Sequence, residues 1–239
     1  MNKVTIVIPT YNEKENIPKI VPALFDLGQE NLHILVVDDN SPDGTGQIAE
    51  ELGKKYDGRV KVLHREGKQG LGTAYLAGFK FALEDGADAI GQMDADFSHP
   101  PEKVLELIAN LENYDAVIGS RYVPGGALDE HWPLWRKWLS GFGNFYARTI
   151  LNLHIRDTTG GFKLWKRATL ENMPLERVKS NGYVFQVEMS YLAHKLGYKF
   201  TEIPIYFADR RWGTSKMSFR IQIEAAVRVW QLLFRYNDL

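Results

Sequence analysis

Short apolar runs alternate with longer amphipathic segments along the first half of the chain. The runs are continuous in hydrophobicity and rich in β-branched side chains, which is typical of buried parallel strands. They cover residues 4–9, 32–38, 60–64, 89–93 and 116–120. The segments between them have the apolar spacing of helices and cover residues 14–28, 43–56, 70–85 and 101–112. This alternation predicts an α/β fold with a doubly wound, mostly parallel sheet flanked by helices.

Three of these helices are preceded by residues that are typical of helix caps. Asn12, Ser41 and Ser98 each stand shortly before an amphipathic segment, with a glutamate or a proline within the next three residues. Such side chains accept hydrogen bonds from the first free N–H groups of a helix. We therefore expect them to cap the helices that follow.

The pattern changes after Ser120. Residues 121–133 have the composition of a loop, and residues 134–152 predict a helix that is rich in aromatic side chains. No linker or low-complexity tract separates the two parts, so we expect a single domain over residues 1–239, in which residues 121–239 add a binding half to residues 1–120. The remaining predicted elements are a glycine-rich turn at 158–161, a helix at 183–196, a strand at 199–207, a polar loop at 208–216 and a helix at 217–236.

The composition of the 239 residues narrows the class of protein. With 44% hydrophobic and 25% charged residues, it is that of an ordinary globular protein. The absence of cysteine excludes disulfides, cysteine-ligated zinc and thiol catalysis. No run of about 18 apolar residues occurs and the first strand begins at Val4, so we expect neither a membrane span nor a signal peptide.

Charge is divided unevenly between the two halves. Residues 1–120 hold 11 Lys+Arg and 20 Asp+Glu, a net charge of −9, whereas residues 121–239 hold 18 and 10, a net charge of +8. An acidic half suits a metal site, and a basic half suits phosphates, nucleic acid or a membrane surface. No RNA-binding motif accompanies the basic residues, so we expect no nucleic-acid partner.

Polar residues follow four of the predicted strands, which is where ligands bind in open α/β sheets. The most informative are Asp94 and Asp96, which end a buried strand one residue apart. Two such carboxylates can bind one hard cation, and oxygen ligands favour Mg²⁺ or Mn²⁺ over zinc. The alternative is a helix cap next to a solvated acid. Asp38 and Asp39 likewise suit either a helix cap or hydrogen bonds to a base or ribose.

Several common catalytic motifs are absent from the sequence. It contains no G-x-G-x-x-G motif, no P-loop and no G-x-S-x-G nucleophile elbow. The six histidines are scattered without an H-x-x-x-H pair, which indicates structural or surface positions. Dinucleotide, ATPase and serine-hydrolase functions therefore have no support.

Taken together, four segments closely resemble the inverting family 2 glycosyltransferases in order and spacing. They are IPTYNE at 8–13, VVDDNSPDGT at 36–45, MDADFSHPPE at 93–102 and GSRY at 119–122. Later segments, at 132–140, 160–162 and 203–216, resemble one branch of that family, the dolichyl- or polyprenyl-phosphate mannose synthases. The resemblance covers nearly the whole chain. It implies a GT-A-like fold and transfer of mannose from GDP-mannose to a polyprenyl (dolichyl) monophosphate with inversion, giving polyprenyl-phosphate mannose and GDP.

The resemblance also implies which residues form the site. The guanosine pocket would consist of Pro9, Tyr11, Glu13, Val37 and Asp39. The metal and the diphosphate would be bound by Asp94, Ala95, Asp96 and Ser98, and covered by Arg210 and Lys216. The acceptor phosphate would be bound by Arg121, Arg136 and Ser140. The residues that would take part in the reaction itself are Asp94, Asp96, Arg121 and Arg210.

The implied reaction needs no general base, because the acceptor phosphate is already anionic near neutral pH. Its rate would come from alignment of the acceptor oxygen with the anomeric carbon. Neutralisation of the charge on the leaving GDP, with Mg²⁺ or Mn²⁺ as cofactor, would supply the rest.

A lipid acceptor implies that the chain works at a membrane. Aromatic and basic residues mix in the predicted helices at 134–152 and 217–236, which is typical of interfacial helices. We expect a cytoplasmic location, peripheral to the cytoplasmic face of a membrane, with direct binding to the surface or a membrane-anchoring subunit. Two alternatives remain open, a UDP-sugar-dependent polyprenyl-phosphate glycosyltransferase and a non-catalytic nucleotide-binding subunit.

Overall fold

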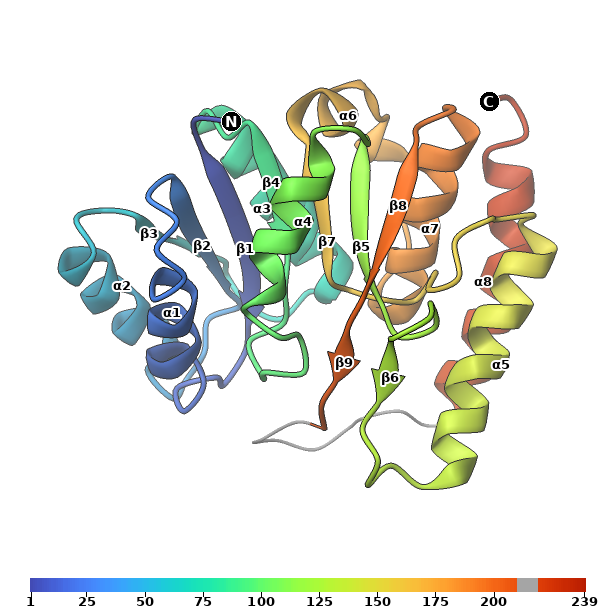
Figure 1. Cartoon of the computed structure of the whole chain (residues 1–239), viewed down its shortest axis with the longest axis horizontal. Coiled ribbons are helices and arrows are strands. Elements are labelled where there is room, and N and C mark those ends of the chain that lie inside the picture. Colours follow the sequence, from blue (N-terminus) through green and yellow to red (C-terminus); the bar gives the residue numbers. More distant parts are fainter. Residues whose placement is uncertain (210–218) are drawn as a thin grey trace.

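A seven-stranded sheet forms the centre of the computed structural model, which describes residues 1–209 and 219–239 (Figure 1). Its strand order is β3-β2-β1-β4-β7-β5-β8, and β3, β2, β1 and β4 pair in parallel. All five strands predicted in the first half are confirmed to within one residue. The strands of the sheet are β1 (Val4–Thr10), β2 (Leu32–Asp38), β3 (Val60–His64), β4 (Ala89–Gln92), β5 (Ala116–Ser120), β7 (Lys163–Lys166) and β8 (Phe200–Pro204).

Side chains along β1 and β2 alternate between the two faces of the sheet. Val7 and Leu35 belong to one buried apolar cluster, and Ile6 and Ile34 belong to the other. Since both faces are covered, both sets of positions are apolar. This is why the strands stand out in the sequence as continuous hydrophobic runs.

Helices pack on both faces of the sheet, and each of the two apolar clusters joins one set of them. One set consists of α1 (Ile17–Phe25), α2 (Thr45–Lys55) and α4 (Lys103–Leu111). The other set consists of α3 (Leu71–Glu84), α5 (Leu134–Ile150), α6 (Arg167–Asn172), α7 (Gly182–Lys195) and α8 (Phe219–Arg235). The doubly wound, mostly parallel α/β fold is therefore confirmed.

The hydrophobic pattern does not predict strand β7. It is only four residues long, has a lysine at each end, and lies antiparallel between β4 and β5. Lys163 is fully buried in spite of its charge. A short strand with charged ends lacks the apolar run by which the other strands were predicted.

The strand predicted at 199–207 divides into two. β8 pairs in parallel with β5, whereas β9 (Tyr206–Phe207) pairs with β6 (Ala127–Leu128) in a separate two-stranded sheet. The break falls at Ile205, whose N–H donates to the Ser120 carbonyl and whose carbonyl accepts from the Ala127 N–H. The loop after β5 is thus attached to the end of β8.

The three predicted helix caps are wrong. α1, α2 and α4 begin four or five residues after Asn12, Ser41 and Ser98, and none of them has a side-chain cap bond. Ser41 instead accepts the N–H of Asn12, and Ser98 donates to Asp96. These polar side chains stabilise the loops at the ends of the strands.

Helices α5 and α8 lie side by side at one end of the molecule (Figure 1). The Tyr146 hydroxyl donates to the Ala226 carbonyl and accepts from the Trp230 indole, at 3.2 and 2.9 Å. Each helix has 17 residues. Within residues 1–209 and 219–239, no helix has the length and hydropathy that a bilayer-spanning helix needs.

Candidate active site

The predicted site residues come from loops that leave the carboxyl ends of the strands, toward the lower side of Figure 1. Pro9 lies near the end of β1 and is in register with Val37 of β2. Asp94 follows β4, and Arg121 follows β5. Because these strands are parallel, their ends meet at one edge of the sheet, where open α/β folds bind ligands.

Tyr11 and Asp39 have different surroundings within the predicted nucleotide pocket. Tyr11 is exposed, and the Lys68 ammonium lies 4.4 Å from the centroid of its ring. Asp39 is buried, and its carboxylate lies 3.2 Å from the Arg65 guanidinium. Burial raises the pKa of Asp39, although the positive charge of Arg65 acts in the opposite direction.

Arg65 and Lys68 are absent from the set predicted from the sequence. Arg65 directly follows β3, and its guanidinium also donates to the side chains of Gln69 and Thr73. Two cations therefore lie beside the predicted nucleotide residues: Arg65 is paired with Asp39, and Lys68 lies against the ring of Tyr11. The only sequence signal for them was a basic residue at the carboxyl end of a strand.

Glu13 and Val37 make contacts within the protein. The Glu13 carboxylate accepts from the Asn16 side-chain amide at 2.6 Å. The main-chain N–H of Glu13 donates to the Thr45 hydroxyl at 2.9 Å. Val37 is fully buried, and its carbonyl accepts from the Thr10 hydroxyl. These bonds fix the loop after β1 against the start of α2.

Asp94, Ala95 and Asp96 form a turn directly after β4. The N–H and the hydroxyl of Ser98 donate to the Asp96 carboxylate at 3.1 and 2.6 Å. Phe97, between them, has a φ of +61°, in the left-handed region that bulky residues rarely adopt. The turn therefore places the Ser98 hydroxyl against the predicted metal-binding carboxylate.

Two buried rings that the sequence reasoning missed also contact Asp94. The Tyr75 hydroxyl donates to its carboxylate at 3.2 Å, and the Asp94 N–H donates to His99 Nδ1 at 3.1 Å. Burial lowers the pKa of His99, so the ring is neutral and Nδ1 can accept. Burial also raises the pKa of Tyr75 well above its ordinary value, with the charge of Asp94 adding to the effect, so the hydroxyl keeps its proton.

The donor set at this turn suits one type of metal site. It provides two carboxylates and a hydroxyl, all oxygen ligands. Among the residues that the structure describes, no three or more His, Cys, Asp or Glu side chains are grouped to bind a metal on their own. Mg²⁺ in particular is commonly bound by one or two carboxylates, with substrate phosphates and water completing the shell. The turn fits a cation of that kind.

Arg121 and Asp157 form a buried ion pair. Nε and Nη2 of Arg121 donate to the two carboxylate oxygens at 2.7 and 2.6 Å, and the Arg121 N–H donates as well. Burial alone would raise the pKa of Asp157, but the charge and the hydrogen bonds of Arg121 lower it below its usual range. Asp157 lies in the loop before β7, 36 residues from its partner, where no local pattern indicated it.

Ser140 and Asn144 connect α5 to this ion pair. The Thr159 hydroxyl accepts from Arg121 Nη2 at 2.8 Å and from the Asn144 amide at 3.0 Å. The Tyr122 hydroxyl donates to Ser140 at 2.7 Å. One hydrogen-bond network thus joins the loop after β5, helix α5 and the glycine-rich turn, and brings together Arg121 and Ser140 of the predicted acceptor set.

Arg136, the third predicted acceptor residue, has a separate environment. Its guanidinium lies 3.5 Å from the centroid of the Trp132 ring and donates to Asp209 at 3.3 Å. The structure does not connect it to the network of Arg121 and Ser140 through any bond among the described residues. Arg210 and Lys216 lie outside the described residues.

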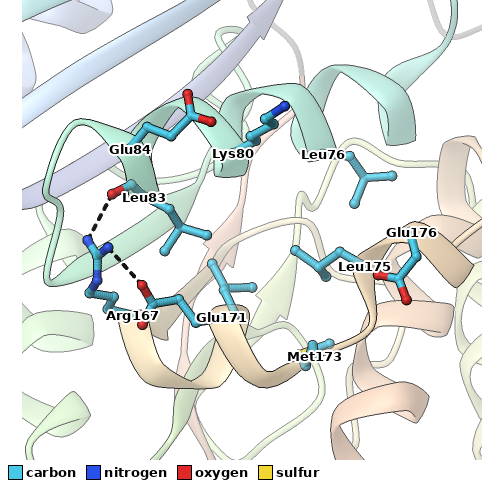
Figure 2. A pocket seen from close by; sticks show the side chains of 10 residues that line it. Leu76, Lys80, Leu83, Glu84, Arg167, Glu171, Met173, Leu175 and Glu176 are labelled. Atoms are coloured by element: carbon cyan, nitrogen blue, oxygen red, sulfur yellow. Dashed lines mark hydrogen bonds and ion pairs between the residues drawn. The ribbon is translucent and has the colours of Figure 1, made fainter.

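A groove at the opposite edge of the sheet contains none of the predicted site residues (Figure 2). It measures about 600 Å³ and lies between α3 and α6. Arg167 at its rim pairs with Glu171 at 2.7 Å and donates to the carbonyls of Leu83 and Ala87, just before β4 begins. The groove therefore lies at the amino ends of the strands, away from the candidate site.

Solved structures with a similar fold include glucosyl-3-phosphoglycerate synthase from Mycobacterium tuberculosis, in complex with Mn²⁺, UDP-glucose and phosphoglyceric acid. The TM-score is 0.65 at 15% identity, and the match covers 99% of this chain and 80% of the other. A second complex of that enzyme, with Mn²⁺, UDP and phosphoglyceric acid, has a TM-score of 0.65 at 18% identity, covering 98% and 78%. At such identities the likeness concerns the fold, and it confirms the GT-A-like architecture.

Sequence comparison goes further. The undecaprenyl-phosphate mannosyltransferase of Micrococcus luteus is 44% identical over 239 residues, covering 99% of this chain and 97% of the relative. The polyprenol monophosphomannose synthase of Mycolicibacterium smegmatis is 46% identical over 214 residues, covering 89% and 80%. The family described as Glycosyl transferase family 2 matches residues 5–173. This chain therefore belongs to glycosyl transferase family 2.

Proposed function

We propose that this chain transfers mannose from GDP-mannose to the phosphate of a polyprenyl (dolichyl) monophosphate, with inversion at the anomeric carbon. The observation that carries the proposal is the identity of 44–46% to two polyprenyl-phosphate mannosyltransferases over most of the chain. The site supports it, because the carboxylate turn after β4 and the arginine after β5 leave the same edge of the sheet.

The donor would bind between the loops after β1, β2 and β4. Its guanosine would contact Pro9, Tyr11, Glu13, Val37 and Asp39. Its diphosphate would lie at Asp94–Asp96 with Ser98, and Arg210 and Lys216 would cover it. A Mg²⁺ or Mn²⁺ ion bound there would neutralise charge on the departing nucleoside diphosphate.

The acceptor phosphate would bind at Arg121, Ser140 and Arg136. The bonds from Arg121 to Asp157 and Thr159 use Nε and Nη2, so Nη1 is left to donate to a phosphate oxygen. The ion pair with Asp157 keeps the guanidinium from rotating. A guanidinium that is already oriented loses little conformational entropy when the acceptor phosphate binds.

The reaction is a single displacement. An oxygen of the acceptor phosphate forms a bond to the anomeric carbon while the bond from that carbon to the diphosphate oxygen breaks. The electron pair leaves with GDP, and no proton has to be removed from the nucleophile. The chain's contribution would be to align the two phosphates in line with the anomeric carbon and to exclude water.

An aromatic face formed by α5 and α8 suits the lipid. Large apolar side chains are exposed along it, including Trp135 and Trp138 at 66% and 70% and Phe234 at 74%. Tyr146 is bonded to α8 and Trp132 is buried, so these two belong to the core. Exposed aromatics next to basic residues are typical of helices that lie in a membrane interface. The chain would therefore work at the cytoplasmic surface of a membrane.

The test is a transfer assay with the purified chain, radiolabelled GDP-mannose and a short polyprenyl phosphate, with and without Mn²⁺. We expect label in the lipid fraction when Mn²⁺ is present, and its loss in Asp94→Asn. Transfer from UDP-glucose in place of GDP-mannose would support the UDP-sugar alternative. Transfer from neither donor would indicate a non-catalytic subunit.

A further inference from the structure

Tyr75 of α3 is a buried side chain whose hydroxyl reaches the candidate metal-binding turn. Its ring is fully buried and stacks on Phe185 of α7, with centroids 5.8 Å apart and planes within 2° of parallel. Phe79, one turn further along α3, stacks on it at 6.0 Å. The hydroxyl donates to the Asp94 carboxylate at 3.2 Å. The ring is thus held on two sides, with its polar end at Asp94.

Two glycines in α3 allow the helix to lie this close to its neighbours. A Cβ on Gly72 would lie 2.4 Å from the Ser180 carbonyl oxygen, and a Cβ on Gly78 would lie 2.4 Å from the Val7 side chain. Real Cβ atoms do not approach other atoms so closely. α3 therefore fits between the sheet and α7 only with these glycines, and this close packing fixes the distance from Tyr75 to the end of β4.

Asp94 is also fixed through its backbone. Its N–H donates to Nδ1 of His99, and the His99 ring stacks on Phe162 with centroids 5.2 Å apart. His99 is buried and follows Asp94 by five residues, whereas Tyr75 belongs to another element. Two independent contacts therefore restrict the residue, one at the main chain and one at the carboxylate.

We propose that Tyr75 is a positioning residue, which orients the Asp94 carboxylate so that it binds a divalent cation together with Asp96. The inference rests on the metal site of the proposed function and adds to it a residue outside the loops that carry the site. Side chains that hydrogen-bond to metal ligands fix the ligand's direction, and their loss typically weakens metal binding by about 10–100-fold.

The test is Tyr75→Phe, which removes the hydroxyl and keeps the ring. Mn²⁺ affinity is measured directly, by the electron paramagnetic resonance signal of free Mn²⁺ during titration of the protein in the presence of GDP. We expect the dissociation constant for Mn²⁺ to rise about 10–100-fold. In steady-state transfer, the KM for Mn²⁺ should rise while kcat at saturating Mn²⁺ changes much less.

Tyr236→Phe is the matched control. The Tyr236 hydroxyl is also buried and donates to a carboxylate, that of Glu188, at 2.8 Å. Tyr236 directly follows α8, which carries no predicted metal residue. This variant should lose stability without any change in Mn²⁺ affinity. Wild-type Mn²⁺ affinity in Tyr75→Phe, or an equal loss in both variants, would overturn the proposal.

Phe185→Leu tests the same placement while leaving the hydroxyl in the chain, and it applies even if Tyr75→Phe does not fold. It removes the stacked neighbour, so we expect a smaller loss of Mn²⁺ affinity than in Tyr75→Phe. An unchanged affinity would contradict the role of the α3–α7 contact.

Asp94→Asn separates the two proposals. Suppose that wild type and Tyr75→Phe bind Mn²⁺ equally well and Asp94→Asn does not bind it. In that case the metal site stands and only the role of Tyr75 fails. If wild type binds no Mn²⁺ with GDP, the metal site and the role of Tyr75 fail together.

Discussion

At the residue scale, the charge of Asp96 can be removed with little change of shape. Asn is nearly isosteric with it and keeps an oxygen that can accept both bonds from Ser98. We expect Asp96→Asn to fold normally and turnover at saturating Mn²⁺ to fall by about 10²-fold or more, because charge stabilisation of the leaving group is lost. The measurement is kcat next to the melting temperature. Wild-type turnover in this variant would remove the metal role of Asp96.

Lys163 provides a test of electrostatics inside the core. Its ammonium is buried and donates to the main-chain and side-chain oxygens of Gln186 at 2.9 and 3.1 Å. Burial lowers the pKa of Lys163 from 10.5 to about 7. Between these two values the unfolded chain binds the proton more tightly than the folded chain. The free energy of unfolding should therefore rise with pH, by at most about 1.4 kcal/mol per unit.

Lys163→Met removes this titration while keeping an unbranched side chain. Denaturant unfolding of both proteins at pH 7 and pH 9 isolates the effect, because all other titrating groups are shared. The stability of wild type relative to Lys163→Met should increase from pH 7 to pH 9. A difference that does not change with pH would mean that Lys163 keeps an ordinary pKa in the folded chain.

Single residues also show where sequence reasoning stops. Asp94 and Asp96 could be selected as candidate metal ligands because they stand on either side of Ala95 in a single motif. The contacts of Asp157 and Tyr75 could not be predicted, since their partners are 36 and 19 residues away and only the folded chain brings them close. The caps at Ser41 and Ser98 were assigned wrongly for a related reason, because a hydroxyl one or two residues before a proline suits a helix start and a loop bond equally well.

At the element scale, long apolar strands could be predicted from the sequence, whereas short or charged strands could not. The first five strands contain apolar runs, and β1, β2, β4 and β5 are almost wholly buried, so their positions followed from the sequence. The positions of β7 and β6 did not, because four- and two-residue strands carry little pattern and the charge of Lys163 hides the first of them. The order of β7 and β5 in the sheet depends on contacts between distant segments, which hydrophobic periodicity does not report.

Helix α5 supports a prediction about membrane binding. Changing both Trp135 and Trp138 to Ser should weaken binding to anionic vesicles and raise the KM for a long-chain acceptor, with little effect on the KM for GDP-mannose. Both side chains are exposed, so little folded-state packing is lost. Vesicle co-sedimentation and steady-state kinetics provide the two measurements.

Leu105→Ser on α4 is the control for the loss of an exposed apolar side chain elsewhere, and it should leave vesicle binding unchanged. A tryptophan pair that alters unfolding but neither vesicle binding nor acceptor KM would contradict a membrane role for α5. The aromatic residues of α8 would then be the next candidates.

At the scale of the whole molecule, the two halves differ in charge, −9 for residues 1–120 and +8 for residues 121–239. A nucleotide that binds the folded chain raises its melting temperature, and at equal concentrations the nucleotide with the lower dissociation constant raises it more. We expect GDP with Mn²⁺ to raise it clearly and UDP with Mn²⁺ to raise it much less, in a thermal shift assay at equal concentrations. Equal shifts would favour the UDP-sugar alternative.

The most direct measurement is a competition between two donors for the same acceptor. The chain is incubated with a polyprenyl phosphate, Mn²⁺ and equal amounts of GDP-mannose carrying ¹³C in the sugar and unlabelled UDP-glucose. The mass and the anomeric configuration of the lipid product are then determined by mass spectrometry and NMR. The proposed function requires the heavy sugar, joined to the phosphate in the β configuration. A light product, or a heavy product in the α configuration, would contradict it.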